Sequence, residues 1–153
     1  MALRNIVKVG DPILRKTSRP VEKFDDRLFT LLDDMKETLY KAEGVGLAAV
    51  QVGVLRRVVV VDCGDGYIEL INPEIIDTEG MQLEVEGCLS LPGESGTTLR
   101  PAIVKLKAQD RTGKWHVYKA DGLKARCFCH ETDHLDGKLF TDRLAPEGMA
   151  DKR

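Results

Sequence analysis

The chain lacks both a long apolar segment and a strong excess of charge of one sign. No apolar run in its 153 residues approaches the ~20 residues that a helix needs to cross a bilayer. Its first residues lack the apolar core of a signal peptide. A formal net charge of −2 gives no electrostatic reason to bind nucleic acid or an anionic membrane. We therefore expect a cytoplasmic protein that has no membrane partner and no direct nucleic-acid specificity.

The sequence is also poor in cysteine and in linker-like segments. Its four cysteines do not suggest a disulfide framework, and in a reducing compartment they are free thiols or metal ligands: Cys63, Cys88, Cys127 and Cys129. There is no internal repeat, no low-complexity tract and no Pro/Gly/Ser linker. A chain of this length suits one hydrophobic core, so we expect a single domain over residues 1–153.

Two helical segments enclose a region of short strands. Leucines and a methionine recur at spacings of three and four over residues 25–42, which predicts an amphipathic helix that ends at Gly44. Residues 123–135 return to helical character. Between the helices, β-branched or alternating patterns predict strands at 57–62, 68–71, 81–85, 103–108 and 115–119, with a hairpin turn at 111–114. This order predicts an α+β fold with mixed or antiparallel sheets and a central second helix.

The second helix carries the strongest chemical signal, His130-Glu131-Thr132-Asp133-His134. Residues four apart on a helix lie one above the other, so both imidazoles can reach one metal ion. Glu131 would then lie beside a metal-bound water, where a general base or acid is needed. A chance match on a polar helix is the competing interpretation, since the pattern fixes only three residues. The apolar side of this helix indicates an interior position, where buried histidines need partners such as a metal.

A catalytic metal site usually has three protein ligands and an open position, so a third ligand is needed. Glu147 lies downstream, as in proteases that take a glutamate from a second helix. Cys127 lies on nearly the same helix face as His130, although a small core residue is its more common role. Cys88 lies where a predicted strand runs through Gly87 into a Pro-Gly turn, but alone it would be interpreted as a buried structural thiol. The residues by themselves leave the third ligand open.

A third segment, residues 44–53, follows the first helix and is rich in glycine and alanine. Its small residues allow close backbone packing, and Gln51 offers a side-chain amide within an otherwise apolar run. A tight helix-to-strand connection with a solvent-facing glutamine is the ordinary interpretation of such a segment.

Taken together and in this order, the three segments resemble the peptide deformylase family. That family has a glycine-alanine-glutamine loop, then Glu-Gly-Cys-Leu-Ser, then the His-Glu-x-x-His helix, and the similarity extends over about residues 5–142. Val50, Leu91 and Cys129 depart from its usual pattern. The chain stops at Arg153, so the longer C-terminal helix of many bacterial members would be short or absent. This weakens the ribosome association that the resemblance would otherwise imply.

The resemblance implies a hydrolase that removes the N-formyl group from the formylmethionine of nascent polypeptides and releases formate. It makes Cys88, His130 and His134 the ligands of one divalent metal, with water in the fourth place. The expected metal is Fe²⁺ in the cell, while Zn²⁺, Ni²⁺ or Co²⁺ can occupy such a site. Glu131 would take the proton of the water and give it to the departing amine.

The resemblance also implies the groups that bind the substrate. The side-chain amide of Gln51 and the backbone N–H of Leu89 would donate to the oxyanion. Arg100 is the candidate partner of Glu86 beneath the site. The remaining contacts comprise a pocket for the methionine side chain and two glycines that present backbone groups to an extended peptide: Val45, Leu123, Arg126 and Cys127 for the pocket, Gly46 and Gly87 for the peptide.

Two other classes of function stay open on the residues alone. A zinc endopeptidase would share the His-Glu-x-x-His helix, although a convincing downstream ligand is missing. A non-catalytic metal-binding or partner-binding domain would need Glu131 only as a solvated helix residue.

Overall fold

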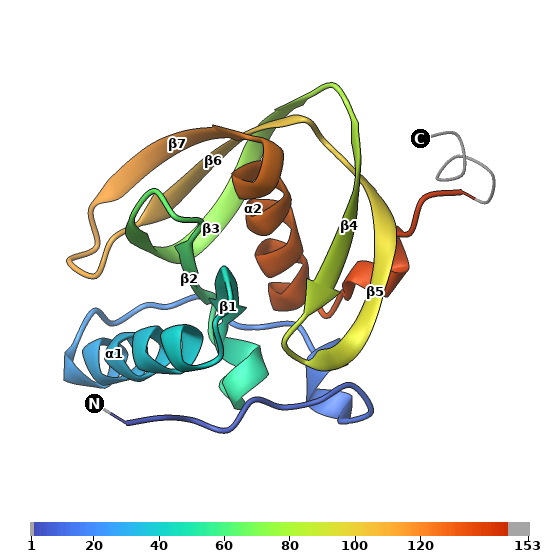
Figure 1. The fold of residues 1–153 in the computed structure, drawn as a ribbon. Helices are drawn as coiled ribbons and strands as arrows, with labels where there is room; N and C mark the ends of the chain where they lie inside the picture. The colour runs from blue at the N-terminus through green and yellow to red at the C-terminus, as the bar shows by residue number, and fades with distance from the viewer. Residues whose placement is uncertain (1, 147–153) are drawn as a thin grey trace.

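The computed structural model describes residues 2–146 (Figure 1). The α+β expectation is confirmed, since two α-helices combine with two antiparallel sheets. The elements follow the chain as η1 (Pro12–Arg15), α1 (Asp26–Lys41), β1 (Gly46–Ala48), η2 (Ala49–Val52), β2 (Val58–Asp62), β3 (Tyr67–Glu79), β4 (Gln82–Cys88), β5 (Leu91–Arg100), β6 (Ile103–Gln109), β7 (Trp115–Asp121), α2 (Gly122–Leu135) and η3 (Phe140–Arg143). In this part of the chain, no helix is long and apolar enough to span a bilayer.

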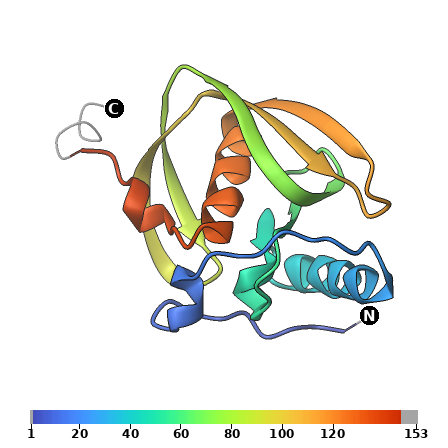
Figure 2. The same ribbon diagram turned by 180° about the vertical axis from the view of Figure 1, so that it is seen from behind.

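The two sheets enclose helix α2. One sheet has the strand order β1-β2-β3-β6-β7, and the other is the β4-β5 hairpin. All pairings between these strands are antiparallel. Helix α2 runs through the space between the sheets, and α1 lies on the opposite side of β1 and β2 (Figures 1 and 2). The helix with the predicted chemistry is therefore the central one.

Strand β2 divides the apolar interior into two clusters. Its four valines are completely buried. Alternate side chains of a strand point to opposite faces of the sheet, so both faces of β2 must be covered. Val59 and Val61 pack into the cluster that contains α2, and Val58 and Val60 pack into the cluster that contains α1. The sheet is thus covered by a helix on each face at this point, which fixes the position of α2 relative to β1.

Both predicted helices are confirmed. Helix α1 begins after Asp25, whose side chain accepts a hydrogen bond from the backbone N–H of Leu28 at 3.2 Å. The alternation of residues 103–108 is also confirmed, because Val104, Leu106 and Ala108 are buried while Lys105 is exposed. The 111–114 segment forms the turn between β6 and β7.

Two strands were missed, and one predicted turn is wrong. The missed strands are β1 and β5, of which β5 covers the expected Pro92-Gly93 turn. The hairpin turns at Leu89 and Ser90 instead. The pairing then shifts from Cys88 with Leu91 to Gly87 with Ser95, so Pro92 to Glu94 form a bulge. Proline lacks the N–H that a strand ladder needs, and Gly93 adopts φ +80°, a combination that a bulge accommodates.

Candidate metal centre and active site

The two histidines of helix α2 face each other across one helical turn. Their Nε2 atoms lie 3.2 Å apart, and their ring centroids are separated by 4.9 Å. Both residues are buried, with His134 completely inaccessible to solvent. The spacing of four therefore brings both ring nitrogens to one point inside the protein, as the sequence predicted.

The third donor comes from the end of strand β4. The Sγ atom of Cys88 lies 3.4 Å from Nε2 of His134, and the donor atoms of Cys88, His130 and His134 all lie within 4.8 Å of one another. Within residues 2–146, this is the one group of three such side chains that could hold a metal ion. The Cys127 thiol turns elsewhere and contacts the carbonyl oxygen of Val45. Glu147, the other candidate, lies outside the described residues.

The charges around these three donors suit a cation. Burial disfavours a charged His130, but Glu131, Cys88 and Glu86 outweigh burial and raise the pKa of His130 to about 10. Burial and the neighbouring His130 lower the pKa of His134 to about 3. One positive charge is thus favoured where the two Nε2 atoms meet. A thiolate with two imidazoles is a donor set typical of Zn²⁺ and Fe²⁺ sites, so the residues present fit a divalent metal.

A buried glutamate fixes the orientation of His130. Glu86 Oε1 accepts hydrogen bonds from His130 Nδ1 at 2.9 Å and from Arg100 Nη2 at 3.0 Å. Glu86 Oε2 accepts from Arg100 Nε at 2.9 Å and from the hydroxyl of Thr98. The expected pairing of Arg100 with Glu86 is therefore confirmed. With Nδ1 donating to Glu86, Nε2 of His130 is left as the ligand atom.

Arg100 extends this network to the other side of α2. Its Nη1 atom donates to Asp133 at 2.6 Å, and Asp133 also accepts from Arg143. Burial opposes the charge on Glu86, but His130 and Arg100 outweigh it and lower the pKa of Glu86 to about 2. Sequence reasoning missed Thr98 and Asp133. The position of Asp133 inside the His-Glu-x-x-His motif was the available signal.

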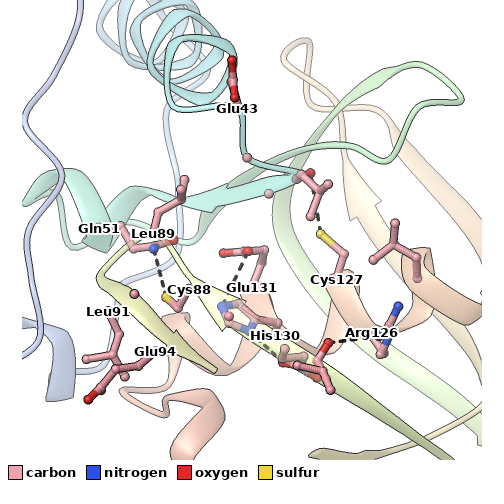
Figure 3. A pocket seen from close by; sticks show the side chains of 18 residues that line it. Glu43, Gln51, Cys88, Leu89, Leu91, Glu94, Arg126, Cys127, His130 and Glu131 are labelled. Atoms are coloured by element: carbon pink, nitrogen blue, oxygen red, sulfur yellow. Dashed lines mark hydrogen bonds and ion pairs between the residues drawn. The ribbon is translucent and has the colours of Figure 1, made fainter. Parts of the chain in front are cut away.

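Glu131 lies beside the three donors and points into an open space (Figure 3). Its Oε2 atom is 4.0 Å from His130 Nε2, and its buried Oε1 atom has no hydrogen-bond partner among the described residues. Burial raises the pKa of Glu131 to about 7, although the nearby His130 charge opposes this shift. A carboxyl group that changes protonation near neutral pH can act as both base and acid.

The side chain of Gln51 is buried rather than solvent-facing. Its Oε1 atom accepts from the backbone N–H of Ala48 at 2.9 Å, which fixes the orientation of the amide. Its Nε2 atom donates to the Ser90 hydroxyl at 3.1 Å and lies 3.6 Å from Cys88 Sγ. Helix η2 therefore aims an amide N–H at Cys88, one of the three candidate ligands. Ser90 was not predicted, although it belongs to the Glu-Gly-Cys-Leu-Ser segment.

Comparison with known proteins agrees with this geometry. A family model described as polypeptide deformylase matches residues 3–149. A peptide deformylase of Alkaliphilus metalliredigens is 58% identical over 147 residues, covering 96% of this chain and 100% of the relative. The crystal structure of peptide deformylase from Thermotoga maritima superposes with a TM-score of 0.93 at 41% identity, covering 95% of this chain and 100% of that one. The chain belongs to the polypeptide deformylase family.

A second solved structure gives the same result. A peptide deformylase structure from Synechococcus elongatus in complex with actinonin has a TM-score of 0.91 at 39% identity, covering 97% of this chain and 82% of that one. The family assignment therefore rests on both sequence and fold over nearly the whole chain.

In this deformylase-family chain, the metal centre opens into a cavity of about 410 Å³. All six residues expected to contact substrate line this cavity, which here is named the substrate cleft: Val45, Gly46, Gly87, Leu123, Arg126 and Cys127. The cleft is also lined by Gln51, Cys88, Leu89, His130 and Glu131. Strand β1 and helix α2 form one side of the cleft and β4 with the bulge of β5 forms the other (Figure 3).

The pocket side of the cleft is closely packed. A Cβ atom on Gly46 would come within 2.6 Å of Cys127 Sγ and 2.7 Å of Glu131 Oε2. Only glycine therefore allows β1 to approach helix α2 this closely. Val45 and Leu123 are 41% and 45% exposed, so they form the rim. Sequence reasoning missed the two exposed carboxylates at the cleft mouth, Glu43 and Glu94.

Proposed function

We propose that this protein removes the N-formyl group from the N-terminal formylmethionine of nascent polypeptides and releases formate. The observation that carries this proposal is the convergence of one thiol and two imidazoles beside a partly unpaired buried carboxylate, at the end of a peptide-sized cleft. Membership of the polypeptide deformylase family supports it.

Cys88, His130 and His134 would hold one divalent metal, which we propose to be Fe²⁺ in the cell, with Zn²⁺, Ni²⁺ or Co²⁺ as substitutes. When bound, such a cation acts as a Lewis acid that acidifies water and polarises a carbonyl group. Glu86 contributes by holding the tautomer of His130 that leaves Nε2 free to coordinate.

Glu131 moves the proton. Its carboxylate takes a proton from the water molecule whose oxygen attacks the formyl carbon. The same carboxyl group then gives the proton to the amine nitrogen as the C–N bond breaks. A pKa raised to about 7 by burial suits both halves of this exchange, because the group gains and loses a proton at little cost near neutral pH.

Gln51 and Leu89 stabilise the negative charge that develops on the formyl oxygen. One N–H of the Gln51 amide donates to the Ser90 hydroxyl, and the amide nitrogen also lies 3.6 Å from Cys88 Sγ, on the side of the cleft. The backbone N–H of Leu89 follows Cys88 directly at the hairpin turn. Donors that are fixed before the reaction stabilise such an oxyanion more effectively than mobile water.

The substrate would bind as an extended strand between β1 and β4. Each of these strands lies at an edge of its sheet, so backbone groups near Gly46 and Gly87 can pair with a peptide. The methionine side chain would enter the pocket formed by Val45, Leu123, Cys127 and the stem of Arg126. Arg126 Nη1 is held by the carbonyl oxygen of Val85 at 3.5 Å, which keeps the stem against the pocket.

We propose that the protein acts in the cytoplasm as one domain over residues 1–153. Its substrates, nascent chains, emerge there, and the reaction requires neither a membrane nor a nucleic-acid partner. The C-terminal tail on which the expected ribosome association depends includes residues 147–153, which lie outside the described residues.

The test is anaerobic purification with metal analysis, followed by measurement of formate released from formyl-Met-Ala-Ser. We expect one metal per chain and formate release, with no release from the acetylated peptide. The Glu131→Gln variant should bind the metal and lose turnover. Cleavage of an internal peptide bond with the formyl peptide untouched would favour a zinc endopeptidase. A fully metallated protein without any turnover would favour a non-catalytic metal-binding domain.

A further inference from the structure

Two cysteines outside the metal centre lie next to each other. The Cys127 thiol lies 3.7 Å from the carbonyl oxygen of Val45, which also accepts a hydrogen bond from the backbone N–H of Asp62 at 2.8 Å. Cys63 follows Asp62 directly and packs against the apolar cluster that contains Cys127. The two thiols are within hydrogen-bonding reach of each other. Both are free.

The two sulfurs differ in their surroundings. Cys63 is partly exposed, at the start of a turn in which Gly64 and Gly66 adopt φ values of +96° and +124°. Cys127 is only 4% exposed and lines the substrate cleft (Figure 3), and its Sγ contacts the carbonyl oxygen of Val45. One cysteine of the pair is therefore accessible to solvent, and the other lies at the wall of the cleft. The glycine-rich turn can adjust when the distance between the sulfurs changes.

We propose that Cys63 is a site of oxidative modification, which Cys127 converts into a disulfide at the wall of the substrate cleft. The oxidant is a hydroperoxide such as hydrogen peroxide. The Cys63 sulfur attacks the peroxide, which breaks the O–O bond and gives a sulfenic acid and one water molecule. The Cys127 sulfur then attacks the sulfenic sulfur, loses its proton and releases a second water. Two thiols are oxidised and one peroxide is reduced to two waters.

The environment of each thiol sets this order of events. Cys63 is partly exposed, whereas Cys127 is only 4% exposed, so peroxide from the solvent reaches Cys63 first. The pKa of Cys63 is also held below its usual value, chiefly by its hydrogen bond with Cys127. The thiolate is the form that attacks peroxide. Cys129 is buried, and burial raises its pKa to about 11. Cys63 is therefore the reactive member, and Cys129 provides a matched control.

Disulfide formation would change the pocket. An S–S bond is about 2.05 Å long, which is shorter than any contact between two thiols. The bond also removes the Cys127 S–H, so Cys127 can no longer donate to the carbonyl oxygen of Val45, at the point where its sulfur packs tightly against Gly46. This consequence rests on the proposed function, in which Cys127 and Val45 bound the methionine pocket. Reduction by a dithiol would restore the open pocket.

The experiment uses the zinc-loaded full chain, because ferrous iron would itself promote oxidation at Cys88. The protein is treated with a small excess of hydrogen peroxide and analysed by intact mass and by mapping of non-reduced peptides. We expect a loss of two hydrogens and a peptide pair joining Cys63 to Cys127. For formyl-Met-Ala-Ser, kcat/KM should fall by about tenfold or more, mainly through KM, because small changes in a side-chain pocket have effects of this size. Dithiothreitol should reverse both changes.

The variants separate the outcomes. Cys63→Ser should keep its activity and resist peroxide, and Cys129→Ser should behave as the unmodified protein does. Equal inactivation of Cys63→Ser, or a disulfide that joins other cysteines, would overturn the proposal. A mapped Cys63–Cys127 bond with unchanged kinetics would overturn its effect on the pocket. If the reduced protein releases no formate, the proposed function fails, while peptide mapping still decides whether the disulfide forms.

Discussion

Replacing Glu86 by glutamine should weaken the metal centre although Glu86 is not itself a metal ligand. The carboxylate accepts four hydrogen bonds, two on each oxygen, from Arg100, His130 and Thr98. Glutamine has the same shape but only one acceptor oxygen. In either orientation of the amide, its NH₂ group faces an N–H of Arg100. In one of the two orientations it also faces Nδ1 of His130, which must then become an acceptor.

The magnitude follows from these contacts. A His130 tautomer with the proton on Nε2 cannot coordinate a metal through that atom, so the protein molecules that carry this tautomer do not bind the metal. Loss of such outer hydrogen bonds typically raises the metal dissociation constant by about 10- to 100-fold, which corresponds to about 1.4 to 2.7 kcal/mol. The metal-free protein should also lose about 1.5 to 3 kcal/mol of unfolding free energy, as expected for a charged hydrogen bond. Asp133 still pairs with Arg100, which keeps this loss below that of an unpaired buried charge.

The assay is a competition titration with a chromogenic chelator, combined with urea denaturation of the metal-free protein. Glu79→Gln is the matched control, because Glu79 is exposed at the end of β3. A Glu86→Gln variant with an unchanged dissociation constant would refute the assigned role of Glu86 in holding His130. Separately, a double-mutant cycle between Glu86 and Arg100 should give a clear coupling energy in the denaturation experiment.

Three further predictions concern the cleft. Glu131→Gln should keep full metal content and lose about 10²- to 10⁴-fold in kcat, as formate release and metal analysis would report; loss of the metal instead would contradict its role as proton carrier. Gln51→Ala should lower kcat by about 10²- to 10³-fold, and a change confined to KM would argue against a donor to the oxyanion. Gly46→Ala should lower kcat/KM by about 10²-fold, because its Cβ would displace Cys127 and Glu131 and such misplacement has effects of this size. Its metal content should stay normal, and wild-type kinetics would show that β1 shifts without consequence.

Several elements could be predicted because their signals are local. The spacing of leucines in α1 and of His130 and His134 in α2 reflects a period of 3.6 residues that any helix imposes. The β-branched run of β2 and the alternation in β6 likewise follow from the geometry of a strand. Strand β5 was missed because proline and glycine inside it resemble a turn, and only pairing with β4 turns them into a bulge.

The ligand set shows where the residues alone were insufficient. Cys88, Cys127 and Glu147 were all candidates for the third ligand, and only the resemblance to a family selected Cys88. The structure brings the Cys88 sulfur to 3.4 Å from His134 Nε2 because β4 ends beside α2. Cys127 is nearer in sequence, but its thiol turns toward Val45. Sequence proximity was therefore a poor guide to proximity in space.

The sequence by itself determined the helix that presents two imidazoles and one carboxylate, since helical periodicity needs no distant partner. It also determined that residues 57–62 form a strand, from their β-branched run. Only the tertiary structure decided what surrounds that helix: the thiol of Cys88, the Glu86–Arg100 pair beneath His130, the buried amide of Gln51, and the contact between Cys63 and Cys127. These contacts join residues 14 to 64 positions apart, from the Glu86–Arg100 pair to the Cys63–Cys127 pair. They depend on two sheets closing around one helix, and no local pattern encodes that closure.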